Sequence, residues 1–485
     1  MTLRPILAVI LLTALSASRL AAGVFTLEQA WTLSLQSDPA IERLQAQAEL
    51  ARLEEAALLA ETDPEFFGAY QTIEDKSPNP APAIFGSKTE TSMVSGGVRG
   101  KLLTATQGSL VFKSEETDNN SIFRTINPMT ISSLNLEVRQ PLLKHFWGRP
   151  DKALRRAARH RHQAALAALM RSKEAVAVRT ASYYLDCYLG SKAIELKDQA
   201  RQEAAKLLSK QKEKQGYGIV ERSDVLQAET SLALRDLEST QAKDARDLAC
   251  AQLAITLGSK TPMPIDSLVL PDLPENGLVR AREELLASAL QDRYDAKAAA
   301  LSTEAQRQDL RSTKLENLPD LSVMASLGYA GLDASRAASL KALDDYNKNV
   351  FTAGISFSIP FAHARERTRK KGALQRLALA QAALADTQRT IVQEVSAALY
   401  TLEMARHKKQ AAADILDLQR RKYAEEEKNF QRARSTTDML IRFQLDVNDA
   451  QALTLAASVE EAKALISLAA ATGKLSGILD HDGAH

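Results

Sequence analysis

Two very long helical runs dominate this sequence, and they constrain the fold more than any other feature. The first run extends from Asp151 to about Lys214 and contains no proline and a single glycine, Gly190. It is filled with Ala, Leu, Gln, Lys, Arg and Glu, which favour helix strongly. A helix of this length would measure about 95 Å, which is more than an ordinary globular domain accommodates.

The second run follows directly and turns back along the first. It extends from Ser223 to Leu257, stops at Gly258, and is separated from the first run by the glycine-rich segment 215–218. Glycine at a helix end allows the left-handed backbone conformation that ends a helix. Residues 150–258 therefore predict a long helical hairpin.

The second half of the chain repeats the order of elements in the first half. Each half has short helices, then strand-like segments, then a long helical hairpin, and four prolines mark a connector at 259–279. Such regularity is typical of an internal duplication. We therefore predict a first repeat at 23–258 and a second at 280–473 with its own hairpin at 363–473, followed by a tail at 474–485.

Alternating apolar and polar residues predict β-strands in both repeats. The strand regions lie at about 65–140 and about 320–360, and the clearest alternation covers 321–329 and 351–359. The first repeat contributes either two or four strands, depending on whether residues 93–113 form a hairpin of the sheet or an insertion. The predicted fold class is mainly α with a smaller β part, built from duplicated helical hairpins and strands.

The N-terminus has the pattern of a secretory signal peptide, which we assign to residues 1–22. Arg4 precedes an apolar run at 6–15, and the small residues that follow offer cleavage within 16–18 or 21–23. After this segment no stretch approaches the roughly 18 to 20 consecutive apolar residues of a membrane helix. A mature chain that enters a membrane is therefore expected to do so through strands closed into a barrel.

The two cysteines, Cys187 and Cys250, lie on opposite arms of the first hairpin. Two interpretations fit this placement. They are either separate buried side chains that behave as small hydrophobes, or partners in a disulfide across the arms.

Several functional classes receive no support from the sequence. A formal net charge of +2 gives no global attraction to nucleic acid, so we expect no nucleic-acid partner. The sequence contains no Gly-rich phosphate loop, no nucleophile elbow and no Cys/His metal spacing. We therefore expect no enzymatic activity, no cofactor and no metal site.

Three motifs resemble those of the TolC-type outer-membrane efflux proteins, and the resemblance covers essentially the whole mature sequence. Residues 139–144 resemble the strand-to-helix joint of that family, residues 218–228 its first hairpin-tip motif and residues 430–440 its second. The resemblance implies a homotrimer with a β-barrel in the outer membrane and an α-helical tunnel that extends into the periplasm.

The resemblance also implies a function. The protein would be the passive exit duct of a tripartite efflux or type I secretion system, and its partners would be a periplasmic adaptor protein, an inner-membrane transporter and outer-membrane lipid. The cargo, whether drug, metal or secreted protein, is not specified, because the pump selects it.

The same resemblance implies a periplasmic gate where the hairpin tips converge, with Asp224, Asp438, Phe430 and Arg434 as candidates. The aromatic gate residue of the family is usually a tyrosine, and Phe430 has no hydroxyl to donate. Ile441 occupies the position of a second acidic residue. Asp224 and Asp438 also lie at or near helix starts, so a role as helix N-cap is equally open.

Basic residues cluster after each strand-to-helix joint, including Arg155 in the first repeat and Arg369 in the second. They either contact lipid phosphates or form a cationic ring in the tunnel, or they belong to a solvated helix face. Trp147, beside the first joint, suits either an anchor at the membrane interface or a packed core position.

A periplasmic coiled-coil adaptor or scaffold without a pore is the alternative function, because it would also use long Ala-rich hairpins. The alternating strands favour the channel, since an adaptor has no use for a row of lipid-facing apolar side chains.

Overall fold

The computed structural model describes residues 25–78, 80–259, 268–271, 281–344, 349–432 and 434–475. The predicted signal peptide and most of the predicted connector and tail lie outside the described residues. The chain forms two compact units, and each combines segments of both repeats. The hairpin unit contains Met1–Ala46, Ala167–Lys297 and Asp386–His485, and the sheet unit contains Gln47–Leu166 and Ala298–Ala385.

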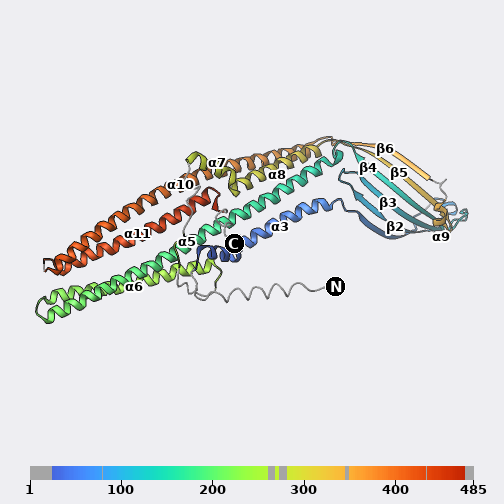
Figure 1. Ribbon diagram of the computed structural model, residues 1–485. Helices are drawn as coiled ribbons and strands as arrows, with labels where there is room; N and C mark the ends of the chain where they lie inside the picture. The colour runs from blue at the N-terminus through green and yellow to red at the C-terminus, as the bar shows by residue number, and fades with distance from the viewer. Residues whose placement is uncertain are drawn as a thin grey trace. The chain divides into compact units, whose positions relative to one another are not determined.

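Two long helical hairpins confirm the predicted duplication of this element (Figure 1). The first consists of α5 (Arg149–Gly216) and α6 (Arg222–Thr256), and the second of α10 (Ala364–Gln431) and α11 (Thr437–Ala471). Gly258 follows α6 and Gly473 follows α11, and both have positive φ angles, of 75° and 72°. The two hairpins therefore end in the same way, as expected for copies of one unit.

Shorter helices precede the strands in each repeat. These are α2 (Leu27–Ser37) and α3 (Pro39–Ala60) in the first, and α7 (Arg282–Asp292) and α8 (Tyr294–Glu316) in the second. Thr26 caps α2 through a capping box with Gln29. The core of the hairpin unit gathers around these helices, with fully or nearly fully buried side chains from α2, α5, α6, α7, α10 and α11: Trp31, Tyr184, Leu253, Leu285, Ile391 and Leu468.

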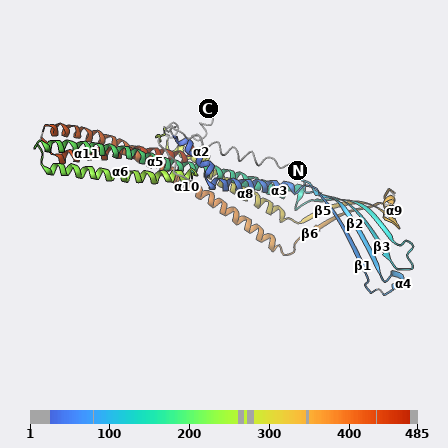
Figure 2. The same cartoon turned by 90° about the horizontal axis from the view of Figure 1, so that it is seen from below.

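Six described strands form one antiparallel sheet, in which each strand pairs with its neighbours in sequence (Figure 2). The first repeat contributes four of them, and the second contributes two. Their bounds are β1 (Glu65–Asp75), β2 (Thr89–Lys101), β3 (Gln107–Asn119), β4 (Met129–Pro141), β5 (Asp320–Asp333) and β6 (Asn349–Ser358). Short helices lie in the intervening segments: α4 (Pro82–Phe85), η1 (Phe146–Gly148), α9 (Arg336–Lys341) and η2 (Ala342–Asp344).

The strand register gives the sheet one apolar face and one polar face. One row of paired residues across all six strands is entirely apolar, namely Phe66, Val98, Leu110, Leu136, Leu327 and Phe351. The adjacent row consists of Glu65, Arg99, Ser109, Glu137, Ser326 and Thr352. Successive residues of a strand point to opposite faces, so these two rows define the apolar face and the polar face.

The described helices include none with the length and apolar composition of a membrane span.

Cys187 of α5 and Cys250 of α6 form a disulfide, with their Cα atoms 4.8 Å apart. Gly190 allows α5 and α6 to approach closely beside the disulfide. A Cβ atom added at this position would lie 2.9 Å from the Cα atom of Arg246. Of the two interpretations of these cysteines, the structure supports the cross-arm disulfide. A disulfide also suits the export from the reducing cytoplasm that the predicted signal peptide implies.

Candidate functional site

The tip of the first hairpin places Asp224 in the first turn of α6. Its carboxylate oxygen Oδ2 accepts a hydrogen bond of 3.3 Å from the backbone N–H of Glu221, the residue that precedes the helix. The side chain is half-buried. Glu221, and not Asp224, is therefore the N-cap of α6, and the N-cap interpretation of Asp224 is wrong. Asp224 stabilises the start of α6 as the acidic partner of a capping box, and its role at a gate stays a prediction.

The tip of the second hairpin is capped by a different residue from the one that we considered. Thr436 is the N-cap of α11, and its Oγ1 accepts from the backbone N–H of Met439 at 3.4 Å. Asp438 lies in the first turn of α11, is exposed, and makes no side-chain hydrogen bond or ion pair with another described residue. Its carboxylate is therefore available to a partner outside this chain.

Asp438 lines a groove of about 500 Å³ between the starts of α6 and α11. Leu226, Leu234, Ile441 and Leu445 provide the apolar part of the lining, and Ser223, Gln227, Arg235 and Glu238 are among the polar residues. Ile441, the residue in place of an expected acid, thus faces the apolar side chains of α6. The groove brings the starts of the two helices that carry Asp224 and Asp438 together.

Direct contacts link the two tips. Gln211 Nε2 of α5 donates a buried hydrogen bond of 3.0 Å to Thr437 Oγ1 of α11. Lys214 Nζ lies 4.9 Å from the ring centroid of Phe430, which lies in the last turn of α10. This cation–π contact uses the face of the ring and needs no hydroxyl, so it explains how phenylalanine can serve at this position. No local pattern in the sequence points to these partners, because each contact joins residues that are far apart in the chain.

Arg434, the fourth gate candidate, is exposed in the turn between α10 and α11. Its backbone N–H donates to the carbonyl oxygen of Asn429 at 2.9 Å. The guanidinium has no ion pair with another described residue. Like Asp438, it presents a free charge at the tip.

In the sheet unit, the three predicted membrane-interface residues have different surroundings. The Trp147 side chain is 54% exposed and meets Phe146 edge to face, with the ring centroids 6.2 Å apart. Arg369 forms an ion pair of 3.1 Å with Glu316 of α8. Arg155 is half-buried on α5 and has no ion pair with a described residue. The charge of Arg369 is therefore balanced within the described chain, whereas that of Arg155 is not, and the role of all three residues at a membrane interface stays a prediction.

The polar face of the sheet carries charges that are largely paired. Arg99 forms two hydrogen bonds with Glu65, of 2.7 and 3.0 Å, and Arg139 lies 3.6 Å from Asp320. Glu65, Arg99 and Arg139 border a hollow of about 400 Å³. A surface of this kind is suited to contact with water and solutes rather than with hydrocarbon.

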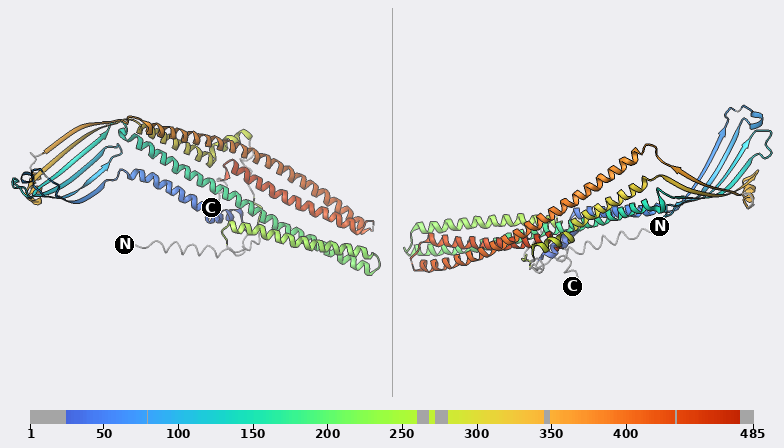
Figure 3. Two further views of the ribbon diagram at one scale, coloured as in Figure 1. Left: turned by 180° about the vertical axis from the view of Figure 1, so that it is seen from behind. Right: turned by 90° about the horizontal axis from the view of Figure 1, so that it is seen from above.

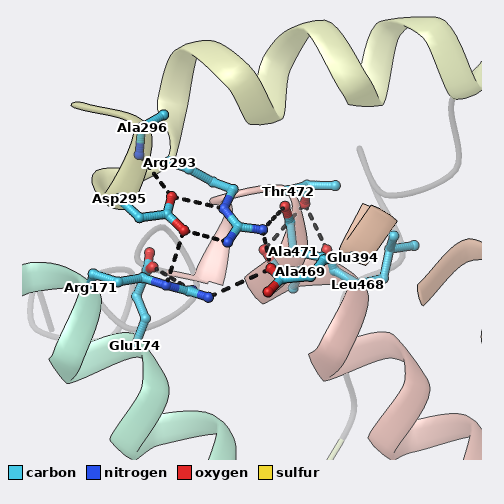
Figure 4. A network of polar contacts seen from close by, with 10 residues as sticks. All are labelled: Arg171, Glu174, Arg293, Asp295, Ala296, Glu394, Leu468, Ala469, Ala471 and Thr472. Carbon is cyan, nitrogen blue, oxygen red and sulfur yellow. Dashed lines mark hydrogen bonds and ion pairs between the residues drawn. The ribbon is translucent and has the colours of Figure 1, made fainter. Parts of the chain in front are cut away.

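Sequence reasoning missed a buried network of charges in the hairpin unit, centred on Arg293 (Figure 4). Arg293 lies between α7 and α8, and its side chain is 1% exposed. It donates to Asp295 through Nε at 3.1 Å and Nη2 at 2.5 Å, to Glu394 of α10 through Nη1 at 2.6 Å, and to the carbonyl oxygen of Ala471 at 3.2 Å. The network therefore joins α8, α10 and the last turn of α11.

Arg171 and Glu174 extend this network onto α5. Arg171 Nη1 lies 3.4 Å from Glu174 Oε2, and Arg171 Nε lies 3.6 Å from Asp295 Oδ2. Glu174 Oε1 is buried without a hydrogen-bond partner. Burial, opposed by Arg171, raises the pKa of Glu174. Burial would also raise the pKa of Asp295, but its bonds to Arg293 prevail and lower it.

The described residues contain no group of three or more His, Cys, Asp or Glu side chains arranged to hold a metal ion.

Comparison with known proteins agrees with this architecture. Residues 285–479 match the family model described as outer membrane efflux protein. Over these residues, the match confirms the resemblance that the motifs predict. No curated protein sequence matches the chain significantly.

Three solved structures show that the fold extends over nearly the whole chain. The outer-membrane channel OprN superposes with a TM-score of 0.68 at 15% identity, covering 92% of this chain and 90% of its own. The Campylobacter jejuni CmeC outer membrane channel gives 0.66 at 16% identity, covering 92% and 85%. The outer membrane protein VceC from Vibrio cholerae gives 0.65 at 17% identity, covering 92% and 96%.

Proposed function

We propose that this protein is the exit duct of a tripartite efflux or type I secretion system, on the basis of the match between residues 285–479 and the family model described as outer membrane efflux protein. The family accounts for a location in the outer membrane with a periplasmic extension, and for the efflux class. The finer proposal is that the duct is passive and conducts whatever an inner-membrane transporter and a periplasmic adaptor deliver.

The exposed apolar face of the sheet carries this proposal. On β6, the side chains of Phe351, Ile355 and Phe357 are 70%, 74% and 62% exposed in the single chain. A continuous apolar surface of this kind marks a contact with lipid or with another protein. The polar row directly behind it suits the water-filled side of a barrel wall. A periplasmic adaptor would not need this pairing of faces.

The two edges of the sheet support a homotrimer. β1 and β6 each pair on one side only within the described chain, and unpaired strand edges invite pairing with another chain. Three copies would close one barrel of three times six strands, in which β1 of one copy pairs with β6 of the next.

Two apolar stripes in the hairpin unit support the same assembly. On α6 the exposed apolar residues share one side of the helix by their spacing, namely Leu234, Leu237, Leu248 and Ile255. On α10 a comparable stripe contains Tyr400, Met404, Ile415 and Leu418. Met404 also lines a mainly apolar groove of about 750 Å³ between α10 and α11. We assign these stripes to contacts between neighbouring copies.

The gate in this proposal lies at the hairpin tips. Gln211 with Thr437, and Lys214 with Phe430, would hold the two hairpins of one copy together. Asp224, Asp438 and Arg434 would provide the charged contacts between copies. Rings of aspartate at a constriction attract cations. An adaptor and a transporter would open the duct by replacing these contacts.

Single-channel recording of the purified protein in planar bilayers tests the proposal. The wild type should conduct rarely, and joint substitution of Asp224 and Asp438 by alanine should raise the resting conductance severalfold, because the tips lose their charged contacts. Asp247→Ala, an exposed change on α6 away from the tip, is the matched control and should leave conductance unchanged.

Two outcomes separate the parts of the proposal. An unchanged closed state in the double variant would leave the aspartates as residues that stabilise helix starts. A protein that is extracted as a soluble monomer without conductance would refute the channel function. It would favour the alternative function, a periplasmic adaptor.

A further inference from the structure

The segment between β5 and β6 contains α9, which packs against the apolar side of the sheet instead of extending beyond the strand ends. Three register partners on the apolar face, Ser114, Ser132 and Gly331, form the surface on which α9 packs. We call this surface the seat of α9. Ser132 Oγ donates to Ser114 Oγ at 3.0 Å and shares a hydrogen bond of 2.7 Å with Ser339 Oγ of α9. The helix therefore lies on the same side as the lipid-facing row.

Gly331 shows how closely this helix approaches the sheet. A Cβ atom at this position would lie 2.2 Å from the backbone oxygen of Ser339. Such a distance is impossible for a real side chain, so only glycine allows α9 to rest on the backbone of β5. The packing of α9 on the sheet therefore depends on the residue type at position 331 and is specified by the sequence of the strand.

A second anchor fixes the start of α9. Arg336 Nη2 donates to the carbonyl oxygen of Ser92 on β2 at 3.3 Å, and Arg336 Nε lies 3.3 Å from Glu116 of β3. Ser92 and Glu116 are register partners in the next row outward from the serine seat. The short helix and Arg336 thus cover the polar groups at the outer end of the apolar face.

α9 lies at the end of the sheet that is away from the long helices of the sheet unit (Figure 3), and the strand register places the end of the apolar band there. On β5, apolar-face residues run from Leu321 to Tyr329, and Gly331 is the next residue on that face. The eight residue steps between Leu321 and Tyr329 span about 26 Å. This is close to the height of roughly 25 Å that the apolar band of membrane barrels has. α9 therefore borders the band at the end away from the strand-to-helix joints.

The outward surface of α9 combines apolar groups with a cation. Ala337, Leu340 and Lys341 are exposed, with Leu340 43% exposed. Lys341 has no ion pair with another described residue. An apolar side chain next to a long cationic one is the combination that interfacial helices use, because the lysine stem covers apolar surface while its ammonium reaches the phosphate level.

We propose that α9 is an interfacial helix that binds the phosphate headgroup layer of the outer leaflet. Leu340 lies at the boundary of the acyl chains, and Lys341 contacts a lipid phosphate. This inference rests on the proposed function, because it takes the apolar face of the sheet as the lipid-facing side of the barrel.

Depth-dependent quenching of fluorescence tests whether α9 lies in the headgroup layer. A fluorophore is attached to Ala337→Cys in the full-length protein, reconstituted in vesicles of phosphatidylethanolamine and phosphatidylglycerol that carry either shallow or deep nitroxide quenchers. Ile355→Cys on the apolar face and Thr352→Cys on the polar face are the controls. We expect shallow quenching severalfold above deep quenching at position 337, the reverse at 355, and quenching at 352 only by a water-soluble agent.

The outcomes distinguish this inference from the function on which it rests. If position 337 responds only to the water-soluble agent while position 355 responds to lipid quenchers, the interfacial helix is wrong and the barrel stands. If position 355 also responds only to the water-soluble agent, the proposed function itself fails.

Two further variants test the seat and the phosphate contact. Gly331→Val should remove most of the lipid quenching at position 337 and leave that at position 355 intact, because it displaces α9. Lys341→Glu should lower shallow quenching severalfold in these anionic vesicles. Unchanged quenching in the first variant would contradict the seat, and in the second it would contradict the phosphate contact.

Discussion

At the scale of single residues, the hairpin unit contains buried charged side chains, whose removal from water costs free energy. Arg293 is fully buried, and its bonds to Asp295, Glu394 and the carbonyl oxygen of Ala471 satisfy it. Glu174 is less well satisfied, because one of its carboxylate oxygens has no partner. Buried ion pairs contribute little net stability, but they define a single arrangement when every member is satisfied.

Glu174→Gln should therefore stabilise the protein at neutral pH. A carboxyl with a raised folded-state pKa favours folding fully below its unfolded pKa and loses that contribution as pH rises to the folded value. Glutamine stays neutral, so the gain should be about 1–3 kcal/mol near pH 7 and should vanish in acid. Thermal denaturation across pH measures it, with the exposed Glu213→Gln of α5 as control. A variant less stable than wild type at neutral pH would refute the argument.

Arg155 and Arg369 provide a residue-scale test of lipid contact at the strand-to-helix joints. Charge reversal of Arg155 should weaken membrane insertion or change ion selectivity, because its charge is not balanced by a described residue. Reversal of Arg369 should have a smaller effect on both, since it breaks an exposed ion pair with Glu316, worth about 0–1 kcal/mol. Vesicle flotation measures membrane insertion, and reversal potentials measure ion selectivity. Unchanged values for Arg155 would assign the cluster to a solvated helix face.

At the scale of elements, the first hairpin is cross-linked and the second has no cysteine. Joint substitution of Cys187 and Cys250 by serine should cost about 2–4 kcal/mol, the usual contribution of a disulfide. The effect should appear as faster hydrogen exchange in α5 and α6 around the former bridge, with α10 and α11 as the internal control. Reduction of the wild type should reproduce it. Equal protection in both hairpins would mean that packing alone holds the arms together.

The elements also show what sequence alone could predict. The helical hairpins and the strands β5 and β6 follow from local periodicity, which one chain displays directly. β2 and β3 were harder to assign, because glycines such as Gly96 and Gly97 lie on both faces and weaken the alternation. Their pairing with β1 and β4 decides between two and four strands, and pairing is not a local property.

The candidate site was predictable only in part, for the same reason. The tip motifs identified Asp224, Asp438, Phe430 and Arg434 as neighbours of the turns. The partners Gln211 and Lys214 lie in an otherwise featureless stretch of α5, and only the packing of the two hairpins brings them to Thr437 and Phe430. Arg293 likewise resembles any helix residue until four segments meet around it.

At the scale of the whole molecule, the stripes on α6 and α10 should govern assembly. Replacement of Leu248 by glutamate should reduce the trimer fraction severalfold, because it buries a charge in an apolar contact. Light scattering of the detergent-solubilised protein measures the change. Lys243→Glu, an exposed position of α6 outside the stripe, should leave the trimer intact. A stable trimer of the Leu248 variant would place the contact elsewhere.

The free edges of β1 and β6 have a genetic consequence. β1 of one copy is proposed to pair with β6 of the next. A copy whose β6 edge is blocked, for instance by a proline, would therefore prevent closure of any trimeric barrel that contains it. Intact rings would then form only in proportion to the cube of the wild-type fraction. Alleles that damage this edge should therefore be dominant, whereas alleles that prevent the chain from folding at all should be recessive.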